Sequence, residues 1–138
     1  MNTDQKRIKV LIADDNLPNR IFLAKCLEEY GTIESVEDGK QAVERFEKAL
    51  NQNKPYDLIC LDIMMPIMDG RTALKRIRAI ENERGIDLRN RSKILMLSAL
   101  DDKDNVIGSF EDQCDGYLVK PFNRTEIQEC LVRFRWLI

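Results

Sequence analysis

The sequence contains no histidine. This absence excludes zinc sites built on imidazole, serine–histidine and cysteine–histidine nucleophile pairs, and any phosphohistidine formed on the chain itself. If a phosphoryl group passes through this protein, the histidine that donates it must therefore belong to another molecule.

Long apolar runs and paired cysteines are also missing. No stretch approaches the about 20 apolar residues of a membrane-spanning helix, and the polar residues 1–9 lack the apolar core of a secretion signal. The four cysteines are widely spaced, form no C-x-x-C pair and lie in apolar or helical contexts, so we expect reduced core thiols: Cys26, Cys60, Cys114 and Cys130. We therefore expect a cytoplasmic protein without a membrane span.

Length and net charge further limit the classes of protein to which this chain can belong. The chain has 138 residues, enough for one domain with a real core and too few for two ordinary domains. Its net charge of -2 provides no general attraction to nucleic acid. We expect a single domain over residues 1–138, with a polar tail at 1–7 and a charged, extended connection at 81–92.

Short apolar runs alternate with helical patterns along the whole chain. Residues 10–13, 32–36, 57–62, 94–97 and 117–119 read as strands. Helix starts are expected at Asn16, Asp38, Asp69, Asp102 and Asn123. The helix near Asp102 carries Gly108, which costs about 1 kcal/mol against alanine and makes this helix the least stable. Five strands that alternate with five helices predict an α/β fold with a doubly wound parallel sheet.

Asp62 ends the most apolar of these strands. The run Leu58–Leu61 precedes it directly, and a carboxylate at the end of so apolar a segment costs several kcal/mol unless its surroundings favour the ionised form. We therefore interpret Asp62 as the reactive residue.

Other polar residues end the neighbouring strands: Asp14 and Asp15, Ser98, and Lys120. Because parallel strands end at one edge of the sheet, these side chains and Asp62 are expected to share one crevice. Carboxylates placed that closely repel one another unless a cation is present, and their hard oxygens suit Mg²⁺ or Mn²⁺. A structural ion-pair network among Asp15, Asp62 and Lys120 is the alternative.

Four motifs together resemble one known family, the response regulator receiver domain of two-component signalling. They are VLIADD at 10–15, DLICLDIMMPIMDG at 57–70, LSA at 97–99 and GYLVKPF at 116–122. The resemblance implies a flavodoxin-like (βα)5 fold with strand order 2-1-3-4-5. It also implies a signalling module that is not an enzyme and whose surface controls partner binding.

The resemblance further implies a phosphoacceptor role for Asp62. The donor would be a phosphohistidine on a histidine kinase or histidine phosphotransfer protein, or a small molecule such as acetyl phosphate. Mg²⁺ would be held by Asp15, Asp62 and the backbone carbonyl of Met64, with Asp14 acting mainly through water. Mn²⁺ could substitute for it.

The same resemblance assigns roles to three further residues. Lys120 would pair with Asp62 before transfer and with a phosphoryl oxygen afterwards, and Ser98 would donate a hydrogen bond to another oxygen. Ser98 and Tyr117 match the family's switch pair, so that phosphorylation would change the surface of the fourth helix, fifth strand and fifth helix for a downstream protein partner. The Lys120–Pro121 bond resembles a joint that is cis in this family.

Two segments differ from the expected pattern. Residues 81–92 form a long connection, and residues 71–91 contain seven basic and three acidic residues. A partner docking site is one interpretation of this charge, and a solvated surface is the other. Trp136 and Val132 share a predicted outer face of the last helix, where an exposed tryptophan suggests a contact surface for a phosphorylation-dependent homodimer.

Three functional interpretations stay open. The first is a single-domain response regulator or phosphorelay intermediate, which the polar start at Met1 favours. The second is the same module within a hybrid kinase or multidomain regulator, with which the apolar end at 136–138 is compatible. The third is a Mg²⁺-dependent phosphatase with an aspartyl nucleophile, which usually has a second acid two residues further on, where this chain has Met64.

Overall fold

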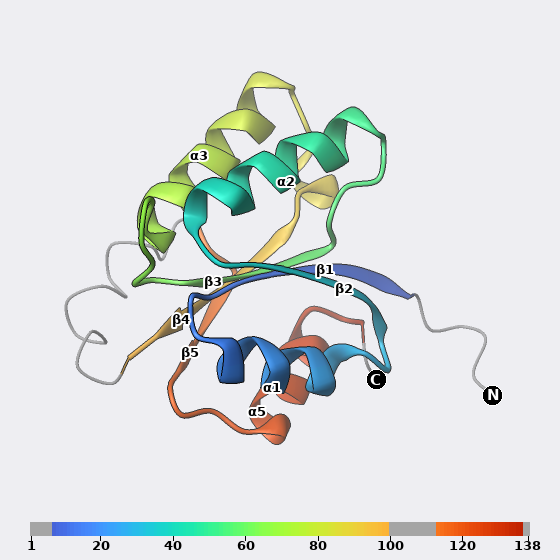
Figure 1. Ribbon diagram of the computed structural model, residues 1–138. Helices are drawn as coiled ribbons and strands as arrows, with labels where there is room; N and C mark the ends of the chain where they lie inside the picture. The colour runs from blue at the N-terminus through green and yellow to red at the C-terminus, as the bar shows by residue number, and fades with distance from the viewer. Residues whose placement is uncertain (1–6, 100–112, 137–138) are drawn as a thin grey trace.

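Five parallel strands form one sheet in the order β2-β1-β3-β4-β5 (Figure 1). The structure is a computed structural model and describes residues 7–99 and 113–136. The strands are β1 (Ile8–Ala13), β2 (Gly31–Val36), β3 (Leu58–Asp62), β4 (Lys93–Ser98) and β5 (Gly116–Val119). The predicted flavodoxin-like parallel sheet and its strand order are therefore confirmed.

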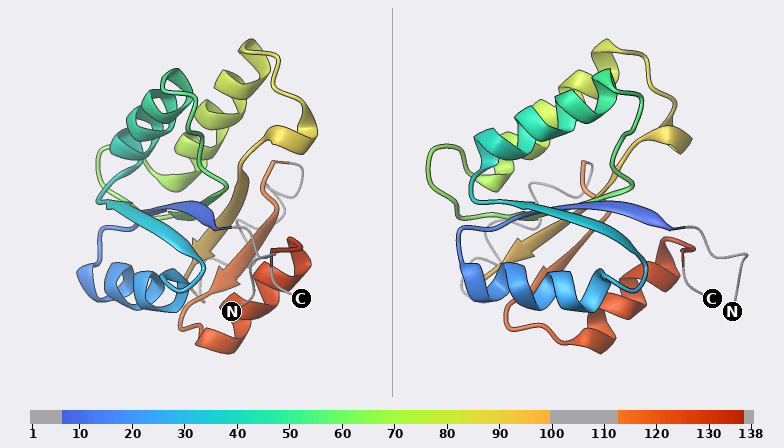
Figure 2. Two further views of the ribbon diagram at one scale, coloured as in Figure 1. Left: turned by 90° about the vertical axis from the view of Figure 1, so that its right-hand side faces the viewer. Right: turned by 45° about the vertical axis from the view of Figure 1, so that its right-hand side comes forward.

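Helices cover both faces of the sheet. The helices are α1 (Leu17–Leu27), α2 (Gly39–Asn51), α3 (Gly70–Glu83) and α5 (Arg124–Arg133), with a 3-10 turn, η1 (Leu88–Asn90), after α3. Helices α2 and α3 lie on one face and α1 and α5 on the other (Figures 1 and 2). The helix predicted near Asp102, with Gly108, lies outside the described residues. Within the described ranges, no helix is long and apolar enough to cross a membrane.

The four helix starts predicted within the described residues have side-chain caps. In each, a carboxylate or amide oxygen accepts the backbone N–H three residues further on, which satisfies one of the unpaired donors of the first turn. The pairs are Asn16 with Asn19 (3.0 Å), and Asp38 with Gln41, Asp69 with Thr72 and Asn123 with Glu126 (2.8 Å each). Glu126 also accepts from the Asn123 N–H at 3.1 Å, which completes the predicted capping arrangement.

Strand residues alternate between two hydrophobic clusters, one on each side of the sheet. Leu11 and Ile59 pack with α2 and α3, whereas Val10 and Cys60 pack with α1 and α5. This alternation explains the continuous apolar runs Val10–Ala13 in β1 and Leu58–Leu61 in β3, because both faces of these strands are buried. All four cysteines are free, and burial raises the pKa of their thiols.

Two aromatic side chains are partly exposed or differ from expectation. Phe22 is 39% exposed on α1. Trp136, predicted to be exposed, is partly buried against the α1–α5 cluster, with its ring 5.6 Å from that of Phe134. The prediction for Trp136 was wrong because α5 ends at Arg133: the chain turns back through Arg135, at φ 66°, so the helical period does not extend to residue 136.

Candidate functional site

The strand register brings the predicted polar residues to one edge of the sheet. Ala13 pairs with Leu61, so Asp14 and Asp62 follow at the same level. Asp62 in turn pairs with Leu97, the residue before Ser98. Ser98 pairs with Val119, the residue before Lys120, and the Lys120 N–H donates to the Ser98 carbonyl at 2.8 Å. The four strand ends therefore form one continuous polar rim.

Asp14 and Asp15 follow β1 and differ in exposure. Asp14 is fully buried, and one of its carboxylate oxygens accepts the Asn16 N–H at 2.9 Å. Asp15 is exposed. The Arg20 guanidinium donates to the Asp14 backbone carbonyl at 2.7 Å and lies 3.6 Å from the Glu37 carboxylate. Arg20 thus links the β1–α1 loop to the β2–α2 loop, a role that sequence reasoning missed because no short motif marks it.

Asp62 and Lys120 form the charged centre of the rim. The Lys120 ammonium lies 3.1 Å from the Asp62 carboxylate and 3.2 Å from that of Asp14. Asp62 is only 6% exposed. Its burial, together with the Asp14 charge, raises the pKa of the Asp62 carboxyl to about 6, against the opposing effect of Lys120. Burial alone would lower the pKa of Lys120, but the two carboxylates outweigh it and raise that pKa.

One buried polar atom at this rim, the Ser98 hydroxyl oxygen, has no hydrogen-bond partner among the described residues, whereas Oδ2 of Asp14 has the Lys120 ammonium at 3.2 Å. Leaving a polar group buried and unpaired costs about 1–3 kcal/mol. Such a cost is typical of sites that bind a ligand rather than of sites that only stabilise the fold.

The carboxylates of the rim are close enough to share one cation. Asp14, Asp15 and Asp62 each offer an oxygen, and these oxygens lie within 4.8 Å of one another. Hard oxygen donors, one of them on an exposed side chain, fit Mg²⁺ or Mn²⁺, which keep some of their water ligands. The donor set thus agrees with the metal expected from the sequence.

The loop after β3 and the strand β5 complete the surroundings of the polar rim. The Met64 N–H donates to the Asp62 carboxylate at 3.3 Å, and the Met64 side chain is exposed. The Lys120–Pro121 peptide bond is cis, as the resemblance implied. Tyr117 is 42% exposed in β5, where it pairs with Met96.

Comparison with known proteins identifies the family of signalling modules to which this fold and rim belong. The family model of the response regulator receiver domain matches residues 10–132, so the chain belongs to that family. The chemotaxis protein CheY of Bacillus subtilis is 32% identical over 125 residues, which cover 89% of this chain and 93% of that protein. Three longer relatives, two histidine kinases and a transcription factor, match this chain over only 10–19% of their own length.

Solved structures support the same assignment. The receiver domain of the sensor histidine kinase PA1611 from Pseudomonas aeruginosa is 32% identical, with a TM-score of 0.73 over 91% of this chain and 95% of that domain, and it holds a magnesium ion in its active-site cleft. The receiver domain of Saccharomyces cerevisiae Ssk1, solved in complex with the phosphotransfer protein Ypd1, is 25% identical, with a TM-score of 0.78 over 97% of this chain and 94% of that chain.

Proposed function

We propose that this chain receives a phosphoryl group on Asp62 and acts as a switch in a phosphorelay. The observation that carries the proposal is the placement of the Asp62 carboxylate, at the end of a buried strand and 3.1 Å from the Lys120 ammonium. The oxygens of Asp14 and Asp15 lie within 4.8 Å of it. A nucleophile beside a cation and a set of metal ligands is what phosphoryl transfer requires.

In the proposed transfer, an oxygen of Asp62 attacks the phosphorus of a phosphohistidine on the donor. The new P–O bond makes an acyl phosphate as the P–N bond breaks, and the electron pair of that bond stays with the donor imidazole. Lys120 then pairs with a phosphoryl oxygen, and the unpaired Ser98 hydroxyl donates to another. Mg²⁺, held by Asp14, Asp15, Asp62 and the backbone carbonyl of Met64, would offset the negative charge of both reactants.

Ser98 and Tyr117 are the proposed switch pair. Ser98 ends β4, and Tyr117 lies one strand away in β5, beside Met96. A phosphoryl group of charge about -2 would attract the Ser98 hydroxyl, and the partly exposed ring of Tyr117 would follow into the space that this movement leaves. The surface that changes would include β5 and α5, which a downstream protein partner would bind.

The donor is proposed to bind across α1, beside the rim. Leu17, Ile21 and Phe22 are exposed apolar side chains on this helix, and Phe22 lines a cavity of about 500 Å³ together with Lys120 and Phe122. A donor that binds this surface would lie beside Lys120, which pairs with Asp62. We therefore expect a histidine kinase or histidine phosphotransfer protein here, and the Ssk1–Ypd1 complex of a related receiver supports this class of partner.

Mass measurement after incubation with acetyl phosphate and Mg²⁺ tests the proposal. We expect an adduct of about 80 Da that is absent in Asp62→Asn. Asp69→Asn is the matched control and should still form the adduct, because asparagine caps α3 as well as aspartate does. Turnover of phosphoesters without an adduct would instead support the aspartyl-nucleophile phosphatase.

A further inference from the structure

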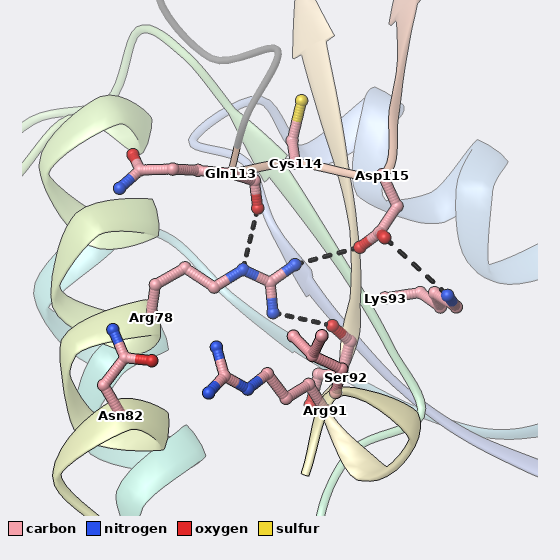
Figure 3. A pocket seen from close by; sticks show the side chains of 9 residues that line it. Arg78, Asn82, Arg91, Ser92, Lys93, Gln113, Cys114 and Asp115 are labelled. Carbon is pink, nitrogen blue, oxygen red and sulfur yellow. Dashed lines mark hydrogen bonds and ion pairs between the residues drawn. The ribbon is translucent and has the colours of Figure 1, made fainter. Parts of the chain in front are cut away.

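A second cavity lies at the end of the sheet opposite to Asp62, beside the start of β4 and the residues that lead into β5. Its volume is about 320 Å³, and Figure 3 shows the polar side chains around it. They come from α3, the connection after η1, the start of β4 and the residues before β5: Arg78, Asn82, Arg91, Ser92, Lys93, Gln113, Cys114 and Asp115. Leu88 of η1 also lines the cavity and is 81% exposed.

Arg78 forms the inner wall of the cavity, and its bonds hold it in place. Its guanidinium donates to the Gln113 carbonyl (2.7 Å), the Ser92 carbonyl (2.9 Å) and the carboxylates of Glu81 (2.7 Å) and Asp115 (2.9 Å). Glu81 is only 1% exposed, and its other oxygen accepts the Ser92 N–H at 3.0 Å. Both ends of the 81–92 connection, Glu81 and Ser92, are therefore buried, and their bonds to Arg78 form the base of the cavity.

The charges around this base do not cancel. Among the residues that the structure describes, three cations (Arg78, Arg91 and Lys93) face only two carboxylates, those of Glu81 and Asp115. Asp115 is shared between Arg78 and Lys93, whose ammonium lies 3.7 Å away. In the described part of the chain, Arg91 has no carboxylate within 4.0 Å, and its guanidinium donates one hydrogen bond, from Nε to the Ile86 carbonyl at 3.0 Å. Its terminal nitrogens thus remain available at the cavity.

We propose that this cavity binds an anionic group, a carboxylate or a phosphate. The Arg91 guanidinium would supply the charged contact, because its planar fork matches the oxygens of both groups. Asn82 and Lys93 would donate further hydrogen bonds, and exposed Leu88 would contact an apolar part of the ligand. Such a site is separate from the phosphoacceptor rim, so the two can be occupied at the same time.

The proposal can be tested by measuring the backbone amide chemical shifts of the protein by NMR in metal-free buffer. Sodium malonate, sodium phosphate and a capped tetraglutamate peptide are each titrated against sodium chloride of matched ionic strength. Binding should move the amide signals of residues 78–82, 91–94 and 113–115. Arg91→Gln should weaken binding about tenfold or more, because it removes a charged hydrogen bond, whereas Arg89→Gln in the same connection should not.

Asn82→Ala is a second test that leaves the connection intact. It removes an exposed side chain from α3, where alanine is well tolerated, and it should weaken binding several-fold. Tighter binding of the peptide than of malonate at equal carboxylate concentration would support a partner protein as the source, and the reverse would support a free anion. Shifts no larger than those in sodium chloride, shifts confined to residues near Asp62, or equal binding by Arg91→Gln and Arg89→Gln would overturn the proposal.

Discussion

Two buried serines at opposite ends of β4 differ in what their hydroxyls contact. The Ser92 hydroxyl donates to the Tyr56 carbonyl at 2.6 Å, whereas the Ser98 hydroxyl has no partner among the described residues. A paired buried hydroxyl stabilises the fold, and an unpaired one lowers its stability. The difference therefore separates a residue that holds the structure together from one that the proposed chemistry requires.

Ser98→Ala and Ser92→Ala should consequently change stability in opposite directions. We expect Ser98→Ala to leave the free energy of unfolding unchanged or raise it by about 1 kcal/mol, and Ser92→Ala to lower it by about 1–2 kcal/mol. Urea unfolding measures both. Only Ser98→Ala should also slow adduct formation with acetyl phosphate, and equal losses of stability in the two variants would contradict this interpretation.

The raised pKa of the Asp62 carboxyl leads to a second prediction, which concerns how the stability of the protein depends on pH. Above about pH 6, the folded protein holds an ionised carboxylate in a place that disfavours charge. As the pH falls through 6, the folded protein binds a proton that the unfolded chain binds only near 3.8, so the stability contributed by Asp62 rises with acidification.

Asp62→Asn should therefore stabilise the metal-free protein at pH 7.5, by about 1–2 kcal/mol. This gain should shrink as the pH falls towards 4, because wild-type Asp62 is then protonated as well. Urea unfolding at several pH values measures the effect, with Asp87→Asn as an exposed control that should show none. A gain that did not depend on pH would be inconsistent with the proposed cause.

At the scale of elements, the start of α3 packs directly against the end of β3. A side chain at Gly70 would place its Cβ 2.2 Å from the Asp62 carbonyl oxygen, and the Gly70 N–H donates to the Ile63 carbonyl at 2.9 Å. The helix cannot move outward without breaking this bond. The position of Asp62 therefore depends on the absence of a side chain at residue 70.

Gly70→Ala should lower the free energy of unfolding by about 1–3 kcal/mol, because backbone atoms on both elements must shift. It should also slow phosphorylation, since Asp62 moves with them. The matched control is Gly85→Ala: its φ is 64° but nothing lies within 4 Å of an added Cβ, so it should cost about 1–2 kcal/mol and leave phosphorylation unchanged. Unfolding in urea and adduct mass distinguish the two variants.

Features set by local pattern could be predicted from the sequence, and features set by distant contacts could not. Helix caps such as Asn16 and Asp38 follow from local chemistry, and the positions of Asp62 and Lys120 follow from the rule that parallel strands end at one edge. The bonds of Arg78 join α3 to segments up to 37 residues away, so no local pattern marks them. Trp136 was misplaced because periodicity does not show where a helix ends.

At the scale of the whole molecule, the rim carboxylates follow two strands that take part in both hydrophobic clusters. Strands β1 and β3 contribute residues to each cluster, and the carboxylates of Asp14, Asp15 and Asp62 follow these same strands. In the unfolded chain Asp62 is far from the adjacent pair Asp14 and Asp15. A cation that binds all three therefore binds the folded state selectively, and its binding energy adds to the stability of the entire domain.

Mg²⁺ should thus raise the Tm of the wild-type protein, by several degrees once its concentration is about 100 times Kd, which corresponds to about 2.7 kcal/mol. The rise should be larger at pH 7.5 than at pH 5, because protonated Asp62 is a poor ligand for a hard cation. Differential scanning calorimetry with and without MgCl₂ measures it. Asp15→Asn, which removes an exposed carboxylate, should abolish most of the rise, whereas Asp69→Asn should retain it. An equal rise in both variants would mean that Mg²⁺ acts elsewhere on the surface.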